Sequence, residues 1–323
     1  MKPNSCKICG YSVAEFLFKV ESKRYAPGEY FDLHRCGKCS GIYIRPLLEF
    51  SDLQKYYPVS YKPHDPKRTK PCNARESIAK PLRKYIYGRR LNPRGTDINT
   101  IRKLLSGMLD KVTYRSFPFP KGEGKLLDIG CGNGTYLAAV KELGWSGFGV
   151  ESNRSSARYA NKSMGLEVQA EDFEVVVYPE KYFDVITMWH SLEHFPDPKK
   201  IIGKVRKLLK DDGILMIGIP NFSSLDRKLF KESWNGLEIP LHAWHYTPGS
   251  LHYLLQDSGF EIRRIIHTAR PSDIMKSFIY FMEDKFRFKP PKWLVMLLFV
   301  IAIPITVFFT ICRRSSIIKV FAS

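Results

Sequence analysis

The chain has 323 residues, 44% of them hydrophobic, and a formal net charge of +19 at pH 7. This length accommodates one large domain with additions, and the hydrophobic content permits a sizeable core. The first ten residues are polar, and four of the seven cysteines fall into two C-x-x-C pairs. We therefore expect no secretory signal and exclude a secreted disulfide scaffold. The cysteine pairs indicate metal binding in a reducing compartment.

The positive charge is concentrated in two flanking stretches. Basic and acidic residues number 9 and 6 in residues 1–59, 16 and 4 in 60–121, 19 and 22 in 122–284, and 7 and 0 in 285–323. These segments therefore carry +3, +12, −3 and +7. Basic flanks favour a polyanion, either anionic lipid or nucleic acid, and a solvated linker is the alternative.

The two cysteine pairs have the spacing of a zinc site. Cys6, Cys9, Cys36 and Cys39 form two C-x2-C pairs separated by 26 residues, with a hairpin expected at residues 25–28. Two such pairs can converge tetrahedrally on one Zn²⁺, and four thiolates leave no open position for catalysis. Structural zinc is therefore predicted, with free or redox-active C-x-x-C motifs as the alternative.

A basic, proline- and lysine-containing stretch follows the cysteines. Residues 58–71 have the composition of a linker, and residues 72–115 are basic with helical patches. A helix around residues 82–90 either faces a membrane or covers the sheet of the next region, and the sequence leaves both interpretations open.

From residue 124 onward, apolar runs of strand length alternate with apolar residues at helical spacing. Strands are expected at residues 125–129, 147–150, 166–170, 183–189, 213–219 and 260–269. Helices are expected at residues 135–143, 197–209 and 247–256. This alternation predicts an α/β fold with a mostly parallel sheet and helices on both faces.

A glycine-rich turn follows the first of these strands. Gly130, Gly132 and Gly134 follow Asp128 at the strand end, and Glu151 ends the second strand. Glycine lets the backbone approach a ligand closely, and a carboxylate at a strand end can accept hydrogen bonds from two ribose hydroxyls. The G-x-G-x-G spacing differs from the G-x-G-x-x-G fingerprint of NAD-binding proteins.

This arrangement resembles motif I of class I S-adenosylmethionine (SAM) methyltransferases. The resemblance covers residues 124–269 and implies a Rossmann-like, doubly wound sheet of seven strands. It also implies that the glycine loop and Asp128 lie near the methionine part of SAM, that Glu151 holds the ribose, and that Asp172 contacts the adenine amino group. The alternatives are a glycine-rich turn in another α/β domain and, for Asp172, a solvated turn.

The fourth strand ends in His190-Ser-Leu-Glu193-His194, followed by a proline-rich turn. This resembles the end of strand four in small-molecule methyltransferases, where residues can reach the acceptor. Methyl transfer needs an aligned acceptor and removal of its proton, and histidine titrates in the right range. His190 and His194 are therefore candidate bases, and Glu193 either orients a histidine or binds a metal. A capping or packing role for Glu193 and His194 is the alternative.

A loop rich in Trp and His, residues 234–248, lies between the fifth strand and the next helix. It resembles the acceptor-site loop of the same enzymes, and it makes His242 and His245 further candidate bases. A loop that only covers the sheet is the alternative. The N/D-P-P-Y/F signature of amino-group DNA methylation is absent, which disfavours a nucleic-acid base as the acceptor.

Residues 293–312 contain no charge and are long enough to span a bilayer as a helix. Basic residues flank the segment on both sides, so the positive-inside rule leaves its orientation open. Pro304 either kinks a single span or turns a re-entrant hairpin. A buried core helix is the alternative.

The sequence therefore predicts a zinc-binding module (1–60), a basic linker or helical region (61–121), a methyltransferase core (122–270) and a membrane-associated C-terminal region (271–323). Residues 42–62 resemble the end of the small zinc domain that precedes the core in some sugar methyltransferases. The interpretation is a membrane-attached, SAM-dependent methyltransferase with a cytoplasmic catalytic domain, structural Zn²⁺, and a small-molecule, sugar or lipid-linked acceptor. The alternatives are an RNA methyltransferase that uses the zinc module and basic segment, and a non-catalytic scaffold.

Overall fold

The computed structural model describes residues 5–57, 115–118 and 123–323, so most of the predicted basic linker lies outside the described residues. The chain forms two compact units that are not consecutive in sequence. Unit 1 contains Met1–Pro58, His190–Gly203 and Gly218–Ala322, whereas unit 2 contains Val59–Trp189, Lys204–Ile217 and Ser323. The cysteine-rich N-terminal residues therefore belong to the same unit as the C-terminal region.

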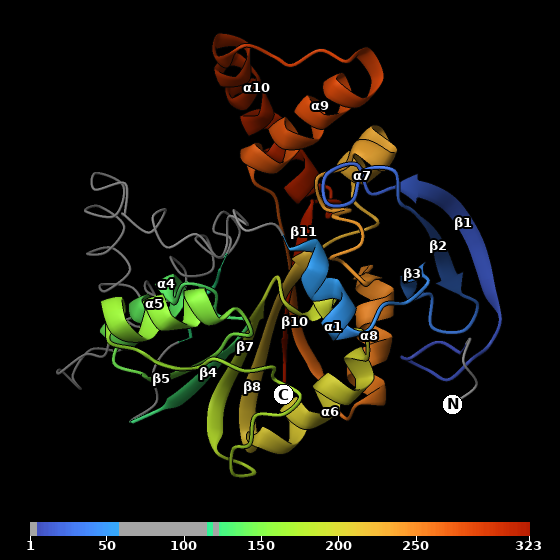
Figure 1. Ribbon diagram of the computed structural model, residues 1–323. Coiled ribbons are helices and arrows are strands. Elements are labelled where there is room, and N and C mark those ends of the chain that lie inside the picture. The colour runs from blue at the N-terminus through green and yellow to red at the C-terminus, as the bar shows by residue number, and fades with distance from the viewer. Residues whose placement is uncertain (1–4, 58–114, 119–122) are drawn as a thin grey trace. The chain divides into compact units, whose positions relative to one another are not determined.

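A large sheet of seven strands organises the fold. Its strands are β4 (Lys125–Ile129), β5 (Ser146–Val150), β6 (Glu167–Gln169), β7 (Phe183–Trp189), β8 (Leu209–Pro220), β10 (Ile262–Thr268) and β11 (Ile317–Ala322). Their order is β10-β11-β8-β7-β4-β5-β6 (Figure 1). β4 is parallel to β5 and β7, and β5 is parallel to β6, whereas β10 and β11 are antiparallel. The predicted α/β, Rossmann-like and mostly parallel sheet is confirmed.

In unit 2, the strand β4 is buried from Leu126 to Ile129, as expected for a parallel strand covered on both faces. The helix α4 (Thr135–Glu142) follows β4, and α5 (Arg154–Met164) follows β5. α5 begins after Asn153, whose side chain accepts a hydrogen bond from a backbone N–H in the first turn. The strand–helix alternation predicted from the sequence thus places the ends of β4 and β5 beside the helices that follow them.

A second, antiparallel sheet lies in unit 1. It contains, in order, β1 (Ala14–Glu21), β2 (Tyr30–Cys36), β3 (Ile42–Arg45) and β9 (Trp244–His245). Glu21 pairs with Tyr30, so a hairpin encloses residues 25–28 as the sequence predicted. β9 belongs to the Trp- and His-rich loop, and its Trp244 pairs with Tyr43 of β3. This loop and the cysteine-rich module therefore share one sheet.

Unit 1 also holds most of the remaining helices. The helical elements outside unit 2 are α1 (Phe50–Leu53), η1 (Gln54–Tyr56), η4 (Leu192–His194), α7 (Leu225–Phe230), η5 (Lys231–Ser233), α8 (Pro248–Asp257), α9 (Pro271–Phe286) and α10 (Lys292–Ile311), and α6 (Pro198–Leu208) is divided between the units. A single core cluster combines Leu33 and Ile44 of the small sheet with Phe230 of α7 and Phe309 of α10.

Two features of the C-terminal region go beyond the sequence-based expectation. α10 continues as one helix through Pro304, so of the two alternatives left open at this proline, the hairpin does not form. Residues 317–322, expected only as the end of a membrane-associated region, form β11 within the large sheet. The apolar run of β11 is only six residues long, and its partner β10 lies far away in the sequence, so no local pattern marked it as a strand of the sheet.

Candidate active site

The turn after β4 is built from glycines with left-handed backbone angles. Gly130, Gly132 and Gly134 have φ values of 72°, 59° and 79°, a region that residues with a Cβ rarely adopt. At Gly134, a Cβ would lie 2.5 Å from Leu166 Cδ1 and 2.9 Å from Ala160 Cβ. The loop therefore requires glycine both for its backbone shape and for its packing.

Glu151 ties the end of β5 to this loop. Its Oε2 accepts a hydrogen bond of 2.8 Å from the N–H of Gly132, and its Oε1 accepts one of 2.8 Å from the N–H of Asn153. The residue is 4% exposed, and burial raises the pKa of its carboxyl group although both N–H donors favour the charged form. A carboxylate oxygen can accept more than one hydrogen bond, so a backbone N–H and a ligand hydroxyl can share it.

Asp128 lies near the end of β4 and is buried within unit 2. Its Oδ1 accepts a hydrogen bond of 2.6 Å from Thr187 Oγ1 on β7. Burial raises its pKa from 3.8 to about 6, while Arg115 and the Thr187 hydroxyl oppose that rise. Asp172 follows β6, and its Oδ1 accepts a hydrogen bond from the N–H of Glu174, so this carboxylate also shapes a turn.

The buried carboxyl group of Asp128 predicts a specific pH dependence of stability. Folding raises the pKa of the Asp128 carboxyl group from 3.8 to about 6, so the protonated group stabilises the folded protein. This contribution to the free energy of unfolding is fully present below pH 3.8 and is lost as the pH rises through 6. A rise of this size corresponds to about 3 kcal/mol of unfolding free energy. Asp128→Asn keeps an acceptor for Thr187 but does not titrate. We therefore expect its free energy of unfolding, relative to that of wild type, to rise by about this much between pH 4 and pH 7.

Urea unfolding of the ligand-free proteins at several pH values measures this difference. Asp211→Asn is the matched control, because Asp211 is exposed and its contact with the exposed Lys181 should contribute little to stability. A pH-independent difference for Asp128→Asn would contradict the prediction.

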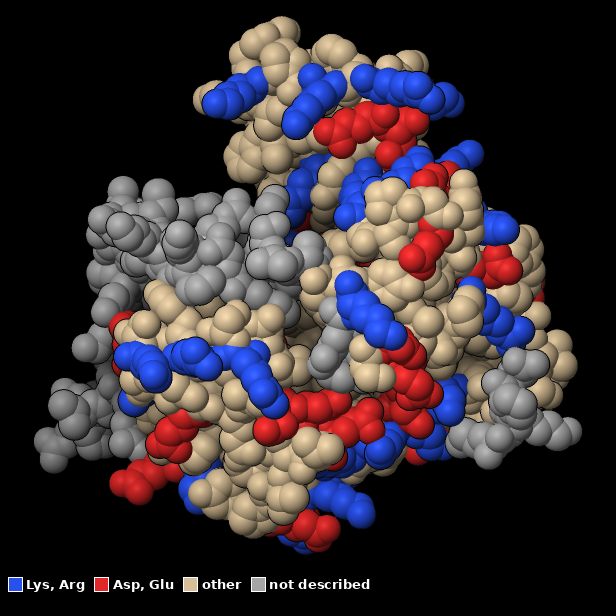
Figure 2. All heavy atoms as spheres, in the orientation of Figure 1, with Lys and Arg blue, Asp and Glu red and all other residues tan. Residues whose placement is uncertain are grey.

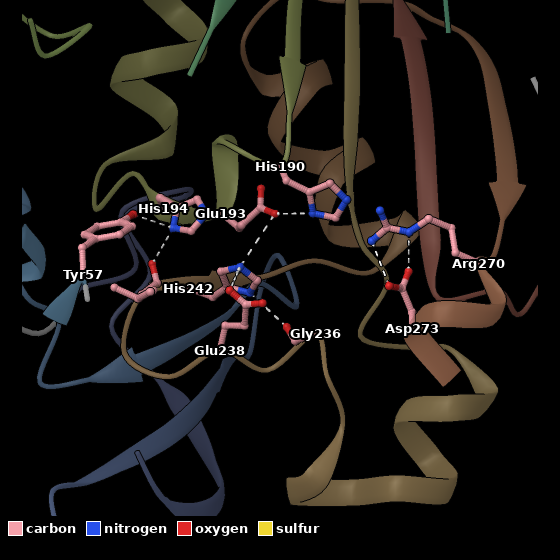
Figure 3. Close-up of polar contacts among 10 residues, drawn as sticks. Tyr57, His190, Glu193, His194, Gly236, Glu238, His242, Arg270 and Asp273 are labelled. Carbon is pink, nitrogen blue, oxygen red and sulfur yellow. Dashed lines mark hydrogen bonds and ion pairs between the residues drawn. The ribbon is translucent and has the colours of Figure 1, made fainter. Parts of the chain in front are cut away.

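A second group of candidate residues lies in unit 1, directly after β7. The chain turns at His190, whose φ of 54° is unusual for a residue with a side chain. This turn brings His190 Nδ1 to 3.0 Å from Glu193 Oε1 on η4 (Figure 3). The His190 side chain is 20% exposed, whereas that of Glu193 is 1% exposed, and burial raises the pKa of the Glu193 carboxyl group.

The rings of His194 and His242 pack edge-to-face, and both are held by backbone carbonyls (Figure 3). His194 Nδ1 lies 2.9 Å from the carbonyl oxygen of Leu241 and 3.0 Å from Tyr57 Oη. His242 Nδ1 lies 2.9 Å from the carbonyl oxygen of Gly236. Burial lowers the pKa of His194 to about 4 and also lowers that of His242, so both imidazoles are neutral at pH 7.

The arrangement can also accommodate a divalent cation. One ligand atom from each of Glu193, His194 and His242 lies within 4.8 Å of the others. A histidine that donates Nδ1–H to a carbonyl directs its Nε2 lone pair away, which is the usual orientation of a metal ligand. Glu193 Oε2 is buried and has no hydrogen-bond partner among the described residues. The geometry thus allows both roles predicted for Glu193, orienting a histidine and binding a metal.

His245 has the surroundings of a core residue. It lies in β9, its Nε2 is 2.9 Å from the carbonyl oxygen of Leu237, and its ring packs edge-on against Phe222. Burial lowers its pKa to about 3. The structure therefore brings four of the five candidate catalytic residues into one cluster and places His245 within the small sheet next to His242.

The cluster includes two residues that the sequence did not single out as functional. Tyr57 contacts His194 across 137 residues of sequence, and nothing local distinguishes it from the other aromatic residues near it. Glu238 Oε2 lies 3.7 Å from His242 Nε2. Its spacing of four residues before His242, within the Trp- and His-rich loop, was a signal that could have identified it.

The four cysteines predicted to bind zinc converge in unit 1. The Sγ atoms of Cys6 and Cys39 are 3.6 Å apart, those of Cys9 and Cys36 are 3.5 Å apart, and all four lie within 4.8 Å of one another. Four thiolates bound tetrahedrally to Zn²⁺ at about 2.3 Å lie about 3.8 Å apart. The four side chains therefore fit a zinc ion with little adjustment.

Comparison with known proteins identifies the class of enzyme. A glycine loop, an acidic strand end and a mostly parallel sheet are features of α/β folds that bind ribose-containing cofactors. Residues 101–265, half of the chain, match the methyltransferase domain family. The chain belongs to this family and is a class I SAM-dependent methyltransferase.

Two relatives and one solved structure illustrate the similarity. The chain is 37% identical over 116 residues to a ubiquinone biosynthesis O-methyltransferase of Histophilus somni (strain 2336). This match covers 32% of this chain and 46% of that protein. It is 31% identical over 107 residues to the protein of the same name from Coxiella burnetii (strain RSA 493 / Nine Mile phase I), covering 32% and 44%. The chain thus spans less than half the length of these curated relatives. A SAM-dependent methyltransferase from Archaeoglobus fulgidus is 17% identical, with a TM-score of 0.44, and the match covers 69% of this chain and 93% of that chain.

Proposed function

We propose that this methyltransferase acts on a hydroxyl oxygen of a small-molecule or lipid-linked acceptor, with His190 as the base. The observation that carries the proposal is the pairing of a partly exposed imidazole with a buried carboxylate at 3.0 Å. This pair directly follows β7, and β7 is parallel to β4, the strand that leads into the glycine loop. The other candidate histidines each face a backbone carbonyl, which suits a structural or ligand-orienting role.

The chemistry assigned to the residues is simple. SAM supplies a methyl group made electrophilic by its sulfonium sulfur, and S-adenosylhomocysteine is the leaving product. Glu193 accepts the Nδ1–H of His190, which fixes the tautomer and stabilises the imidazolium. His190 Nε2 takes the proton of the acceptor hydroxyl as the oxygen bonds to the methyl carbon and the C–S electron pair moves to sulfur. The protein thus contributes alignment and proton removal.

We assign the binding of SAM to the residues of unit 2. Glu151 is proposed to hold the ribose hydroxyls, the loop of Gly130, Gly132 and Gly134 together with Asp128 to lie along the methionine part, and Asp172 to contact the adenine amino group. The left-handed glycines and the hydrogen bonds of Glu151 support this assignment, because they place backbone and a carboxylate at the carboxyl ends of adjacent parallel strands.

Two observations support the choice of acceptor. The curated relatives are named O-methyltransferases, which favours oxygen as the acceptor atom. The helix α10, which carries no charge after its first residue Lys292, favours attachment to a membrane, where a lipid-linked acceptor is within reach of a cytoplasmic catalytic domain. The rival proposal of RNA methylation relies on the basic segment 61–121, most of which lies outside the described residues.

Methyl transfer from labelled SAM by the full chain in detergent tests this proposal. Membrane lipid, a soluble metabolite extract and RNA are offered in parallel. We expect label in the lipid or in the soluble fraction, in products with a new O-methyl group. Label only in RNA would reject the proposed acceptor class, and SAM binding without label in any fraction would favour the scaffold alternative.

We also propose that the four cysteines hold one structural Zn²⁺. Replacing a thiolate opens the tetrahedral site, and because binding free energy of structural zinc is folding free energy, Cys36→Ser should destabilise unit 1 by several kcal/mol. We expect the metal content to fall from about one Zn²⁺ per chain to near zero, together with a lower thermal midpoint. Elemental analysis and thermal unfolding measure both quantities. Cys312→Ser is the control, since Cys312 is exposed and lies outside the cluster; retention of zinc by Cys36→Ser would contradict the assignment.

A further inference from the structure

α10 presents most of its surface to solvent. Its fully buried residues, Ala302, Thr306 and Phe309, form one narrow seam. Large apolar side chains cover the rest, and five of them recur at helical spacing as a continuous stripe: Met296, Val300, Ile303, Val307 and Ile311. An exposed apolar surface of this extent marks an interaction site rather than ordinary surface.

The polar groups of α10 are satisfied within the helix. Thr306 Oγ1 donates to the carbonyl oxygen of Ile303 at 2.7 Å, and Thr310 Oγ1 donates to that of Thr306 at 2.8 Å. Among the described residues, this is the one helix whose length and composition suit a bilayer. Beyond Lys292 at its first position, the helix can therefore enter hydrocarbon without carrying a charge or an unpaired hydroxyl.

The ends of α10 carry the features of a membrane interface. No acidic residue occurs from residue 285 onward. The basic residues at both ends are exposed: Lys285, Arg287, Lys289, Lys292, Arg313 and Arg314. Phe286, Phe288 and Trp293 are exposed among them. In the region of α9 and α10, Figure 2 shows several groups of Lys and Arg side chains, with uncharged surface above them and acidic side chains below. This combination is complementary to the headgroups and acyl boundary of an anionic membrane.

The connectivity of unit 1 prevents α10 from crossing a bilayer on its own. β10 ends at Thr268 and β11 begins at Ile317, and these two residues are partners in the antiparallel pair. The chain between them, which contains α9 and α10, therefore leaves and returns at one place in the sheet (Figure 1). α10 is about 30 Å long, whereas residues 312–316 reach at most about 18 Å. If α10 crossed a bilayer, α9 and the residues that join it to α10 would have to cross it as well.

α9 is unsuited to such a crossing. Ile274, Phe278 and Phe281 pack against the core cluster of unit 1 rather than facing outward. The helix also carries charges of both signs along its length: Asp273, Lys276, Glu283, Asp284 and Lys285. Several charged groups on one short helix are costly in hydrocarbon, so α9 belongs to the protein and its partner α10 is the element exposed to lipid.

We propose that α10 lies in one leaflet of an anionic membrane without crossing it, so that both of its ends stay on the side where β10 and β11 lie. This inference rests on the membrane attachment in the proposed function and deepens it by naming the surface and its topology. The apolar stripe enters the acyl boundary of the membrane, and the basic ends bind lipid headgroups. The seam of Ala302, Thr306 and Phe309 remains packed against the rest of unit 1.

Flotation of the zinc-loaded full chain with vesicles tests the surface. We expect binding to phosphatidylcholine vesicles containing phosphatidylglycerol, and weaker binding to phosphatidylcholine alone. Val300→Asp/Val307→Asp should reduce the bound fraction at least about tenfold, because it places two charges on the stripe. Val175→Asp/Val177→Asp is the matched control, since these valines are exposed elsewhere, in unit 2. Equal flotation of both double variants would overturn the proposal.

Labelling with a membrane-impermeant maleimide tests the topology. Cys312 at one end of α10 is exposed, and Lys292→Cys supplies a reporter at the other end. In sealed membrane vesicles of known orientation, peptide masses should show both positions modified from the same side. Modification from opposite sides would establish a span and overturn the proposal. SAM binding by the same preparations, measured separately, keeps a failure of this inference distinct from a failure of the proposed methyl transfer.

Discussion

Glu151→Gln is expected to weaken SAM binding by about a hundredfold or more. Both carboxylate oxygens accept backbone N–H groups, one from Gly132 in the glycine loop and one from Asn153. An amide replaces one of these acceptors with an NH₂ group that faces a donor, and it also removes the charge offered to the ribose. Hydrogen bonds to charged groups contribute about 1.5–3 kcal/mol each, so losing one bond to the backbone and one to the ribose reaches this magnitude. Isothermal titration with SAM measures the effect.

Glu180→Gln is the matched control for this prediction. Glu180 is exposed in unit 2, and its replacement removes the same charge without altering the loop. Its SAM affinity should stay within about twofold of wild type, because an exposed charge contributes little. If Glu151→Gln bound SAM as tightly as this control, Glu151 would serve the loop alone and the assignment of the ribose would fail.

The sequence predicted the parts of the fold that local patterns specify. Buried parallel strands are nearly continuous apolar runs, so β4 and β7 were recognisable in isolation. β11 was not, because six residues are too few to show a pattern that assigns them to the sheet. The pairing of Thr268 with Ile317 is a long-range contact, and no local pattern encodes it.

The candidate site was predictable by residue type but not by role. Four histidines near the ends of strands all had the right chemistry for a base. What distinguishes them is burial and hydrogen bonding. His194, His242 and His245 are held by backbone carbonyls, whereas His190 is partly exposed and lies at 3.0 Å from Glu193 Oε1, an atom that His242 Nε2 approaches only to 4.0 Å. These contacts depend on how the chain folds back on itself, so the sequence left the alternatives open.

The cysteine cluster proposed to bind zinc and the histidine cluster belong to one unit. Tyr43 of β3 pairs with Trp244 of β9, and the Trp244 indole N–H donates to the carbonyl oxygen of Pro196, just after η4. Tyr57 also contacts His194 directly. The cysteine-rich module therefore packs against the residues that hold the histidine cluster. The proposed structural zinc ion would stabilise the proposed active site through these contacts.

His190→Asn is expected to reduce the rate of methyl transfer by about 10²–10⁴-fold while leaving SAM affinity unchanged. Asparagine tolerates the left-handed backbone that His190 adopts at φ 54°, so the variant should fold while lacking a base. The glycine loop and Glu151 are untouched, which separates catalysis from cofactor binding. Single-turnover assays with labelled SAM, alongside titration calorimetry, measure the two quantities.

His252→Asn, an exposed position on α8, is the matched control and should transfer methyl groups at the wild-type rate. The comparison also separates the two roles open to Glu193. If His190 is the base, Glu193→Gln should lower the rate and shift its pH profile, because the imidazolium loses the partner at 3.0 Å. If a cation held by Glu193, His194 and His242 activates the acceptor instead, His190→Asn should keep most of its activity, and that outcome would reject His190 as the base.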